Sequence, residues 1–235
     1  MNSSRLQNYT IYHNNSEEYH RIKKEVFTSD SYYFETENPT PFIIDAGAHI
    51  GLSTLYFKQT YPKSEVVALE PNPNSFELLE KNLFENQIDG VTAVKVALSD
   101  HEGFESFFLD ETEEQWYSTA GFHRGSWVGT QRSEEITVPT QKLSSFVTKP
   151  VDLLKMDIEG AEQKVLFASQ DCLWLIKEIN IEFHPHPTQS LPKLVELLER
   201  THKVELFKNT NSVLLKKAIG LVQIRASIRS SHKTT

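Results

Sequence analysis

The sequence predicts an α/β fold in which a mostly parallel, seven-stranded sheet carries helices on both faces. Short, continuously apolar segments at Phe42–Ile44 and Val66–Leu69 have the character of parallel strands that are buried on both sides, and Val151–Met156 is expected as a further strand in the centre of the sheet. The longer stretch Asn74–Asn86 repeats its apolar residues at helical spacing. Strands that alternate with helices in this way are typical of a doubly wound, Rossmann-like sheet.

Composition and charge agree with one globular domain. The chain has 235 residues, of which 38% are hydrophobic, and this suits a single α/β domain. A net charge of −8 argues against a nucleic-acid partner, which would select a basic face. The single cysteine, Cys172, excludes an intramolecular disulfide and a multi-cysteine zinc site. The sequence has neither the apolar core of a signal peptide nor a membrane-spanning run, so we expect a cytoplasmic protein.

Three regions divide the chain. Residues 1–40 are polar and aromatic, and we interpret them as a cap with a helix near Ser16–Phe27. The main domain is expected to span residues 41–217, with a flap inserted at about 101–140. Residues 218–235 are mildly basic, and we expect a loose terminal tail there rather than a helix on a membrane surface.

The remaining elements follow in chain order. Helices are expected from Leu52 to Pro62 and at Gln189–Arg200, where apolar residues recur at helical spacing. Further strands are expected at Val91–Leu98, Phe104–Leu109, Glu178–Phe183, Val204–Phe207 and Ser212–Leu215.

The loop after the first strand carries the clearest ligand-binding signal. The segment FIIDAGAHIG places Asp45 at the end of the strand, and Gly47 and Gly51 then make a tight turn into a helix. Glycines let backbone amides approach a ligand closely, and the first turn of a helix offers unpaired N–H groups. Glu70 ends the neighbouring strand, where a carboxylate can accept two hydrogen bonds from a ribose diol. These residues predict an adenosine-type cofactor at the carboxyl ends of the first two strands.

An acidic residue in this loop favours one of two cofactor classes. A dinucleotide fingerprint reads Gly-x-Gly-x-x-Gly, whereas this loop reads Asp45-x-Gly47-Ala48-x-x-Gly51. A carboxylate here would repel a pyrophosphate, but it suits the ammonium group of S-adenosylmethionine. In these residues the chain resembles the class I S-adenosylmethionine-dependent methyltransferases. An NAD(P)-dependent reductase and a cofactor-binding module without catalysis are the alternatives.

This resemblance implies a set of cofactor contacts along the first three strands. Asp45 would orient the amino end of the cofactor, directly or through water, and the glycine turn would form the floor of the site. Ser99 or Asp100 could reach the adenine ring, although an acidic turn explains these two residues almost equally well. The expected cofactor-binding residues are Asp45, Gly47, Ala48, His49, Gly51, Glu70, Pro71, Asn72, Ser99 and Asp100.

Four segments sharpen the resemblance. FIIDAGAHIG, VVALEPNP, VALSDHEG and LLKMDIEGAE, in this order, are similar to the FkbM family of methyltransferases over about residues 40–210. The resemblance implies S-adenosylmethionine-dependent O-methylation, commonly of a hydroxyl on a sugar or a natural product. His49 stands where many members carry Asn, a conservative change for a polar loop. The most specific part of the pattern consists of Lys155, Asp157, Glu159, Gly160 and Glu162.

We expect the reacting hydroxyl to lie at the ends of the fourth and fifth strands. Asp157 follows the fourth strand, and Glu182 and His184 alternate onto one side of the end of the fifth. We predict Asp157, Glu159 and His184 as catalytic residues, with His184 as the general base because its ordinary pKa lies near neutrality. Asp157, Glu182 and His184 could also bind a divalent metal, although we expect activity without one. A strand-end turn fixed by two prolines is the structural alternative.

The segment Trp116–Gly129 breaks both hydrophobic periods with three glycines, two tryptophans and a histidine. We interpret it as a flap whose aromatic faces hold a small-molecule or glycan acceptor, and an ordinary surface excursion is the alternative. The expected substrate-binding residues are Trp116, Tyr117, His123 and Trp127.

Overall fold

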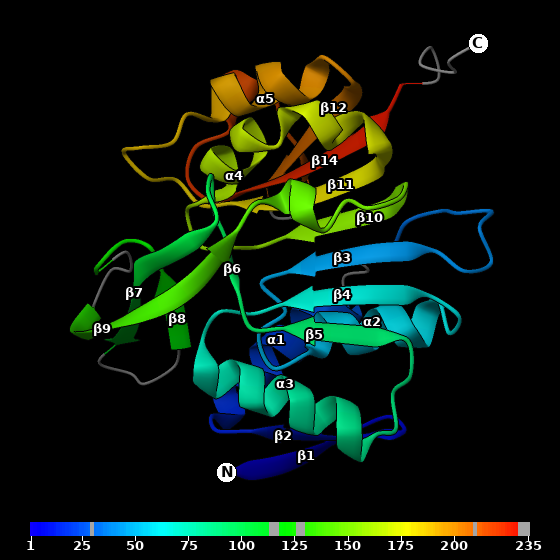
Figure 1. Ribbon diagram of the computed structural model, residues 1–235, viewed down its shortest axis with the longest axis vertical. Helices are drawn as coiled ribbons and strands as arrows, with labels where there is room; N and C mark the ends of the chain where they lie inside the picture. The colour runs from blue at the N-terminus through cyan, green and yellow to red at the C-terminus, as the bar shows by residue number, and fades with distance from the viewer. Residues whose placement is uncertain (29–30, 113–117, 126–129, 209–210, 230–235) are drawn as a thin grey trace.

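The computed structural model describes residues 1–28, 31–112, 118–125, 130–208 and 211–229. Its main sheet (Figure 1) has the order β13 (Asn211–Ser212), β12 (His202–Lys208), β14 (Val222–Ile228), β11 (Ile176–Phe183), β10 (Val151–Met156), β3 (Phe42–Ala46), β4 (Glu65–Leu69) and β5 (Val91–Val94). The strands from β11 to β5 run parallel, and β14 runs antiparallel to both of its neighbours. This confirms the predicted α/β class, and β14, in the stretch expected to be a loose tail, adds an eighth strand to the expected seven.

Helices cover both faces of the sheet because alternate residues of the central strands point to opposite sides. Ile43 shares an apolar cluster with the helices Ser16–Thr28 and Leu52–Thr60, whereas its neighbour Ile44 shares one with the helices Glu162–Ala168 and Leu191–Glu199. Full burial of such a side chain stabilises the fold by about 1.5–3 kcal/mol. No helix of the described residues is long and apolar enough to cross a bilayer. The helices are α1 (Ser16–Thr28), α2 (Leu52–Thr60), α3 (Pro73–Glu85), α4 (Glu162–Ala168) and α5 (Leu191–Glu199).

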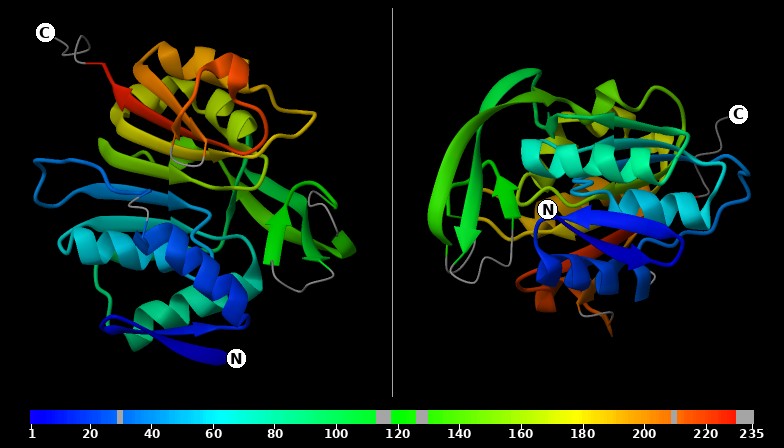
Figure 2. Two further views of the ribbon diagram at one scale, coloured as in Figure 1. Left: turned by 180° about the vertical axis from the view of Figure 1, so that it is seen from behind. Right: turned by 90° about the horizontal axis from the view of Figure 1, so that it is seen from below.

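The N-terminal region contains the expected helix and, in addition, a hairpin. The strands β1 (Asn2–Leu6) and β2 (Tyr9–His13) pair antiparallel and lie beside α3 (Figure 2). The side chain of Asn82 in α3 bonds to the backbone of β2 as a neighbouring strand would. It accepts from the Tyr12 amide at 2.7 Å and donates to the Tyr12 carbonyl at 3.0 Å. This side chain thereby ties the N-terminal cap to the main sheet's helical layer.

A second, antiparallel sheet occupies most of the predicted flap. It has the order β6 (Ala97–Leu98), β9 (Thr130–Gln141), β7 (Gly103–Thr112) and β8 (Ser118–Gly121), and it stands beside the carboxyl ends of the central strands (Figure 1). Only its short β6 pairs parallel, with β9, whereas the β9–β7 and β7–β8 pairs are antiparallel. The expected single strand Val91–Leu98 is therefore wrong in its second half. The chain leaves the main sheet after β5, and Ala97 packs instead with Phe107 and Val138 in the core of the second sheet.

The expected loose tail at residues 218–235 is corrected by β14. This strand lies between β11 and β12, and its pairs extend from Phe183 with Val222 to Glu178 with Ser227. Val222, Ile224 and Ala226 are fully buried, which matches the alternation of apolar and polar residues in VQIRASI. The expected strand Ser212–Leu215 is reduced to Asn211–Ser212, and a 3₁₀ turn at Leu215–Lys217 follows it.

Candidate functional site

The main cavity of the described residues lies at the carboxyl ends of β3, β4, β10 and β11. Residues after these four strands form its floor, the second sheet forms one wall, and α1 forms another. A position outside the carboxyl ends of the strands is where open α/β sheets bind their ligands. The cavity thus joins the two loops that the sequence singled out, after β3 and after β10.

Gly47 locks these two loops together. Its φ is +79°, and a Cβ atom there would lie 1.8 Å from the carbonyl oxygen of Asp157, so no other residue fits without moving β10. The Asp157 amide in turn donates to the Ala46 carbonyl at 3.0 Å. The two strand ends are therefore held in one fixed geometry.

The cofactor side of the cavity is organised around Glu70. One carboxylate oxygen accepts the His49 amide and the other accepts the Asn72 amide, each at 2.8 Å. Both oxygens keep a further lone pair for a ligand. Burial raises the pKa of Glu70, while the charge of His49 and the two backbone amides oppose the shift. The expected residues Gly47, Ala48, His49, Glu70, Pro71 and Asn72 all line this side.

Two of the expected cofactor residues have structural roles beside the cavity. Gly51, with φ +93°, precedes α2 and packs on Leu79, where a Cβ atom would meet Leu79 Cδ1 at 2.7 Å. Asp45 is fully buried and does not line the cavity. Its Oδ2 accepts the hydroxyls of Ser53 and Thr54, each at 2.7 Å. The expectation that Asp45 orients the cofactor directly is therefore corrected, because its oxygens face α2 and β10.

Lys155 is the partner of Asp45 on the side of β10. Its Nζ lies 3.3 Å from Asp45 Oδ1 and donates to the Gly47 carbonyl at 2.7 Å. Burial lowers the pKa of this ammonium group, but Asp45 and Asp157 outweigh that effect and raise it overall. Lys155 lines the cavity, so the sheet presents a permanent positive charge beneath the glycine loop.

Ser99 and Asp100 do not line the main cavity, although the three residues that precede them do. Val96, Ala97 and Leu98 provide an apolar wall instead. The Ser99 hydroxyl donates to Glu105, and Asp100 lies 2.9 Å from Nδ1 of His101. These contacts lie within the second sheet and its β6–β7 connection, and they do not support the expected contact with an adenine ring.

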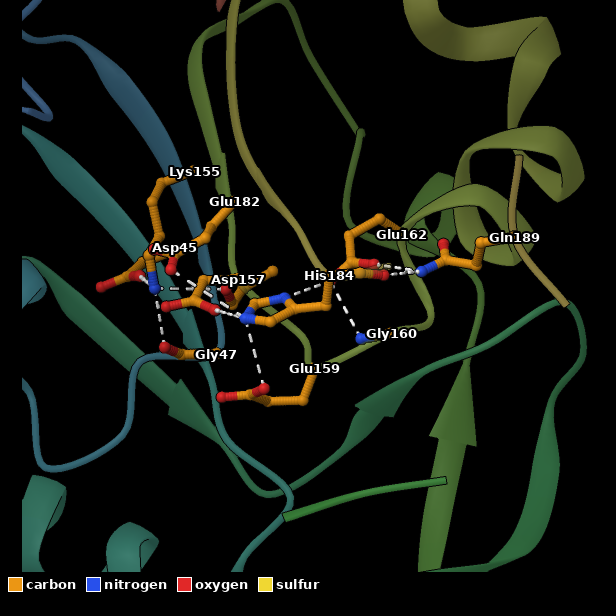
Figure 3. A network of polar contacts seen from close by, with 11 residues as sticks. Asp45, Gly47, Lys155, Asp157, Glu159, Gly160, Glu162, Glu182, His184 and Gln189 are labelled. Carbon is orange, nitrogen blue, oxygen red and sulfur yellow. Dashed lines mark hydrogen bonds and ion pairs between the residues drawn. The ribbon is translucent and has the colours of Figure 1, made fainter. Parts of the chain in front are cut away.

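The acceptor side holds a cluster of carboxylates around one imidazole (Figure 3). His184 Nε2 lies 3.3 Å from Glu159, 3.8 Å from Asp157 and 4.0 Å from Glu182. All four residues line the cavity, so the structure brings together the side chains that the sequence singled out, and their catalytic role stays a prediction. Glu159 has φ +54°, an unusual backbone conformation that turns its side chain toward the imidazole.

Glu162 fixes the other side of this imidazole, a role that sequence reasoning missed. It is fully buried, and its Oε1 accepts from His184 Nδ1 and from the Gly160 amide, both at 3.0 Å. Its Oε2 accepts from Gln189 at 2.8 Å. Because Nδ1 must donate to Glu162, Nε2 faces the cavity. The hydrogen bond between His184 and Glu162 joins residues that are far apart in the sequence. The only sequence signal for it was the second glutamate of the EGAE segment.

The electrostatics of the cluster correct the predicted role of His184. Burial disfavours its cation, but the hydrogen bond to Glu162 and the charges of Glu159 and Asp157 raise its pKa to about 10. Burial raises the pKa of Glu159 to about 7, with Asp157 adding to the shift and His184 opposing it. A pKa of this size favours the imidazolium at neutral pH, and an imidazolium has no free lone pair to accept a proton from a substrate, so this environment does not suit the predicted general base.

Glu182 keeps a proton for a related reason. Burial, together with the nearby charges of Asp157 and Glu25, raises its pKa to about 9. Glu25 belongs to α1, and the same helix contributes Arg21 to the cavity wall. The N-terminal region thus supplies charged groups to the site, which agrees with its interpretation as a cap.

The same cluster has the geometry of a candidate metal centre. One ligand atom from each of Asp157, Glu159 and His184 lies within 4.8 Å of the others. Glu162 on Nδ1 would act as the outer carboxylate that metal-binding histidines commonly have. A cation would first have to displace the proton of His184, whose pKa is about 10.

Of the predicted acceptor residues, the structure describes only His123. Trp116, Tyr117 and Trp127 lie outside the described residues. The ring of His123 stacks on that of His186, with 3.6 Å between the centroids, and it approaches Gly160. It lines a second, more open cavity beside α4 rather than the main one.

Comparisons with known proteins show which family the chain resembles. A family model described as the methyltransferase FkbM domain matches residues 45–211. The methyltransferase sdnD of Sordaria araneosa is 32% identical, over 76% of this chain and 79% of its own length. The 31-O-demethyl-FK506 methyltransferase FkbM of Streptomyces tacrolimicus is 26% identical, over 74% and 78%.

A solved structure supports the fold. The methyltransferase FkbM from Methylobacillus flagellatus KT superimposes with a TM-score of 0.57 at 13% identity. The alignment covers 85% of this chain and 46% of that longer one, so it bears on architecture alone. The architecture is the expected class I methyltransferase fold.

Proposed function

The chain belongs to the FkbM family of methyltransferases, and from this premise we propose that it transfers a methyl group from S-adenosylmethionine to a hydroxyl of a sugar or natural-product acceptor. The observation that carries the proposal is one cavity with two chemically distinct sides. On one side, the Glu70 carboxylate, held by two backbone amides that donate to it, suits a diol, and on the other side Glu159 with His184 suits a proton transfer. The name of the Streptomyces relative also specifies an O-linked methyl group.

The residues on the first side fit the proposed cofactor. The free lone pairs of Glu70 suit the two ribose hydroxyls, and the apolar wall at Val96–Leu98 suits a heteroaromatic ring. The floor at Gly47 and Ala48 leaves room for the amino-acid end. S-adenosylmethionine supplies, when bound, a methyl group on a strongly electrophilic sulfonium. The protein therefore has to supply alignment and a place for one proton.

We assign that proton to Glu159. The acceptor hydroxyl would lose its proton to a Glu159 oxygen as its oxygen bonds to the methyl carbon, while the methyl–sulfur bond would break and leave a neutral thioether. A base with a pKa of about 7 is well matched to this task at neutral pH. The imidazolium of His184, 3.3 Å away, holds the carboxylate toward the cavity and balances its charge. Glu162 keeps the imidazolium in place from behind.

Calorimetric titration with S-adenosylmethionine and with NAD tests the proposal against its rivals. We expect binding of S-adenosylmethionine alone. Binding of NAD without S-adenosylmethionine would favour a reductase, and binding of neither would favour a module without this cofactor. Incubation of cell extracts with radiolabelled S-adenosylmethionine then finds the acceptor, and the Glu159→Gln variant provides the inactive control.

A further inference from the structure

The connection before β14 forms a defined turn that carries apolar side chains on its outside. We call residues Val213–Leu221 the rim segment. The amides of Lys217 and Ala218 donate to the carbonyls of Leu214 and Leu215, at 2.8 and 3.1 Å. Lys208 of β12 donates to the Ile219 carbonyl at 2.7 Å. These bonds fix the path of the rim segment against the sheet.

Four large hydrophobic side chains of the rim segment face solvent. Leu214 is 64% exposed and Ile219 is 74% exposed, with Leu215 and Leu221 at 39% and 44%. Single exposed hydrophobic residues are common, but four within eight consecutive positions indicate an interaction surface for another protein or a membrane. The exposure ends abruptly at Val222, which directly follows the rim segment and is fully buried. Packing within the fold therefore does not account for the four exposed apolar side chains.

The part of the sequence that contains the rim segment has a net charge opposite in sign to that of the whole chain. The 30 residues after Glu205 contain six Lys and Arg and no Asp or Glu, whereas the complete chain has a net charge of −8. Lys216 and Lys217 lie inside the rim segment and are exposed. Apolar side chains interleaved with lysines are complementary to a surface that is both apolar and anionic.

The rim segment lies at the same edge of the sheet as the catalytic cluster. Val222, which follows it, pairs with Phe183, and Phe183 directly precedes His184. Gln223 pairs with Phe207, so the end of β12 reaches this edge as well. Figure 1 shows β14 starting at the edge toward which the arrows of β3, β4 and β10 point.

We propose that the rim segment docks this protein onto the surface of an anionic lipid bilayer. Leu214, Leu215, Ile219 and Leu221 enter the boundary between headgroups and acyl chains, and Lys216 and Lys217 contact lipid phosphates. Docking in this way places the catalytic edge of the sheet toward the membrane. The binding itself does not depend on the proposed methyl transfer.

Sedimentation with vesicles tests the proposal on the full chain. One vesicle preparation contains phosphatidylcholine alone, and the other contains phosphatidylcholine and phosphatidylglycerol in equal parts. We expect the protein to sediment with the anionic vesicles and not with the neutral ones. Replacing both lysines with glutamate should weaken the partition by at least roughly fivefold for each charge removed. The Leu214→Ser, Ile219→Ser double variant should abolish it.

Matched controls separate docking from general effects. Phe84 is 81% exposed on α3, and Lys193 is exposed on α5, so Phe84→Ser and Lys193→Glu change the same chemistry elsewhere. Both controls should sediment like the parent, and thermal melting should show that every variant is folded. Equal sedimentation of parent and rim variants would overturn the proposal. So would an absence of vesicle binding accompanied by a dimer, in analytical ultracentrifugation, that the rim variants dissociate.

Discussion

Replacing Glu162 by Gln should lower the pKa of His184. The variant keeps the size of the side chain but removes the charge that accepts from His184 Nδ1 at 3.0 Å. A hydrogen bond to a charged group contributes about 1.5–3 kcal/mol. Since one pKa unit corresponds to about 1.4 kcal/mol, the pKa of His184 should fall by roughly one to two units from its value of about 10. Stability should also fall, because Gln189 and Gly160 share the same carboxylate.

Imidazole resonances in NMR spectra report this pKa without any knowledge of the acceptor. The signal of His184 is identified by its loss in a His184→Gln variant and is followed from neutral to alkaline pH in the parent and in Glu162→Gln. Glu196→Gln, an exposed change on α5, is the matched control and should leave the titration unaltered. A parental His184 that titrates near its ordinary value of 6.5 would refute the electrostatic reasoning and restore this residue as a candidate base.

Three further predictions concern the cofactor, the protons and the metal. Glu70→Ala should weaken the binding of S-adenosylmethionine roughly tenfold or more in calorimetry, because a charged hydrogen-bond acceptor is lost; an unchanged dissociation constant would remove Glu70 from the site. The pKa of Glu182 is about 9 when folded and 4.5 as an ordinary carboxyl, so the folded state binds the extra proton and this residue's contribution to stability falls as the pH rises between these values. Glu182→Gln should lessen that fall, as thermal unfolding from pH 5 to 9 would reveal by comparison with the parent. Exhaustive chelation should leave methyl transfer intact, because the proton on His184 already balances the carboxylates; loss of turnover that magnesium or manganese restores would instead identify a metal enzyme.

Six of the expected cofactor residues line the cavity because they lie in two short loops that follow neighbouring strands, and their contact with a cofactor stays a prediction. The contacts in this region come from the backbone of Gly47, His49 and Asn72. A loop with positive φ angles can be recognised in the sequence by its glycines. Asp45 was misinterpreted since its place at a strand end says nothing about which face its side chain occupies. The structure turns it toward Ser53 and Lys155, away from the cavity.

The acceptor side resisted prediction for a different reason. The pKa of His184 depends on Glu159, Asp157 and Glu162, and these residues reach it from another strand end and another helix. An isolated histidine titrates near neutrality, so a judgement from residue type alone assigned it the wrong protonation state. The sequence could indicate which residues meet at this edge of the sheet, but their protonation states depend on mutual distances that only the structure provides.

The position of β14 constrains how the molecule can assemble. Its partners β11 and β12 come earlier in the chain, and they meet each other only through it. A growing polypeptide therefore completes residues 1–221 while this half of the sheet still has a gap, with two strand edges open to wrong partners. The family match ends at residue 211, so a fragment cut to the matched boundaries would lack the strand that closes the gap. Expression trials with such a fragment should produce aggregates rather than a smaller working enzyme.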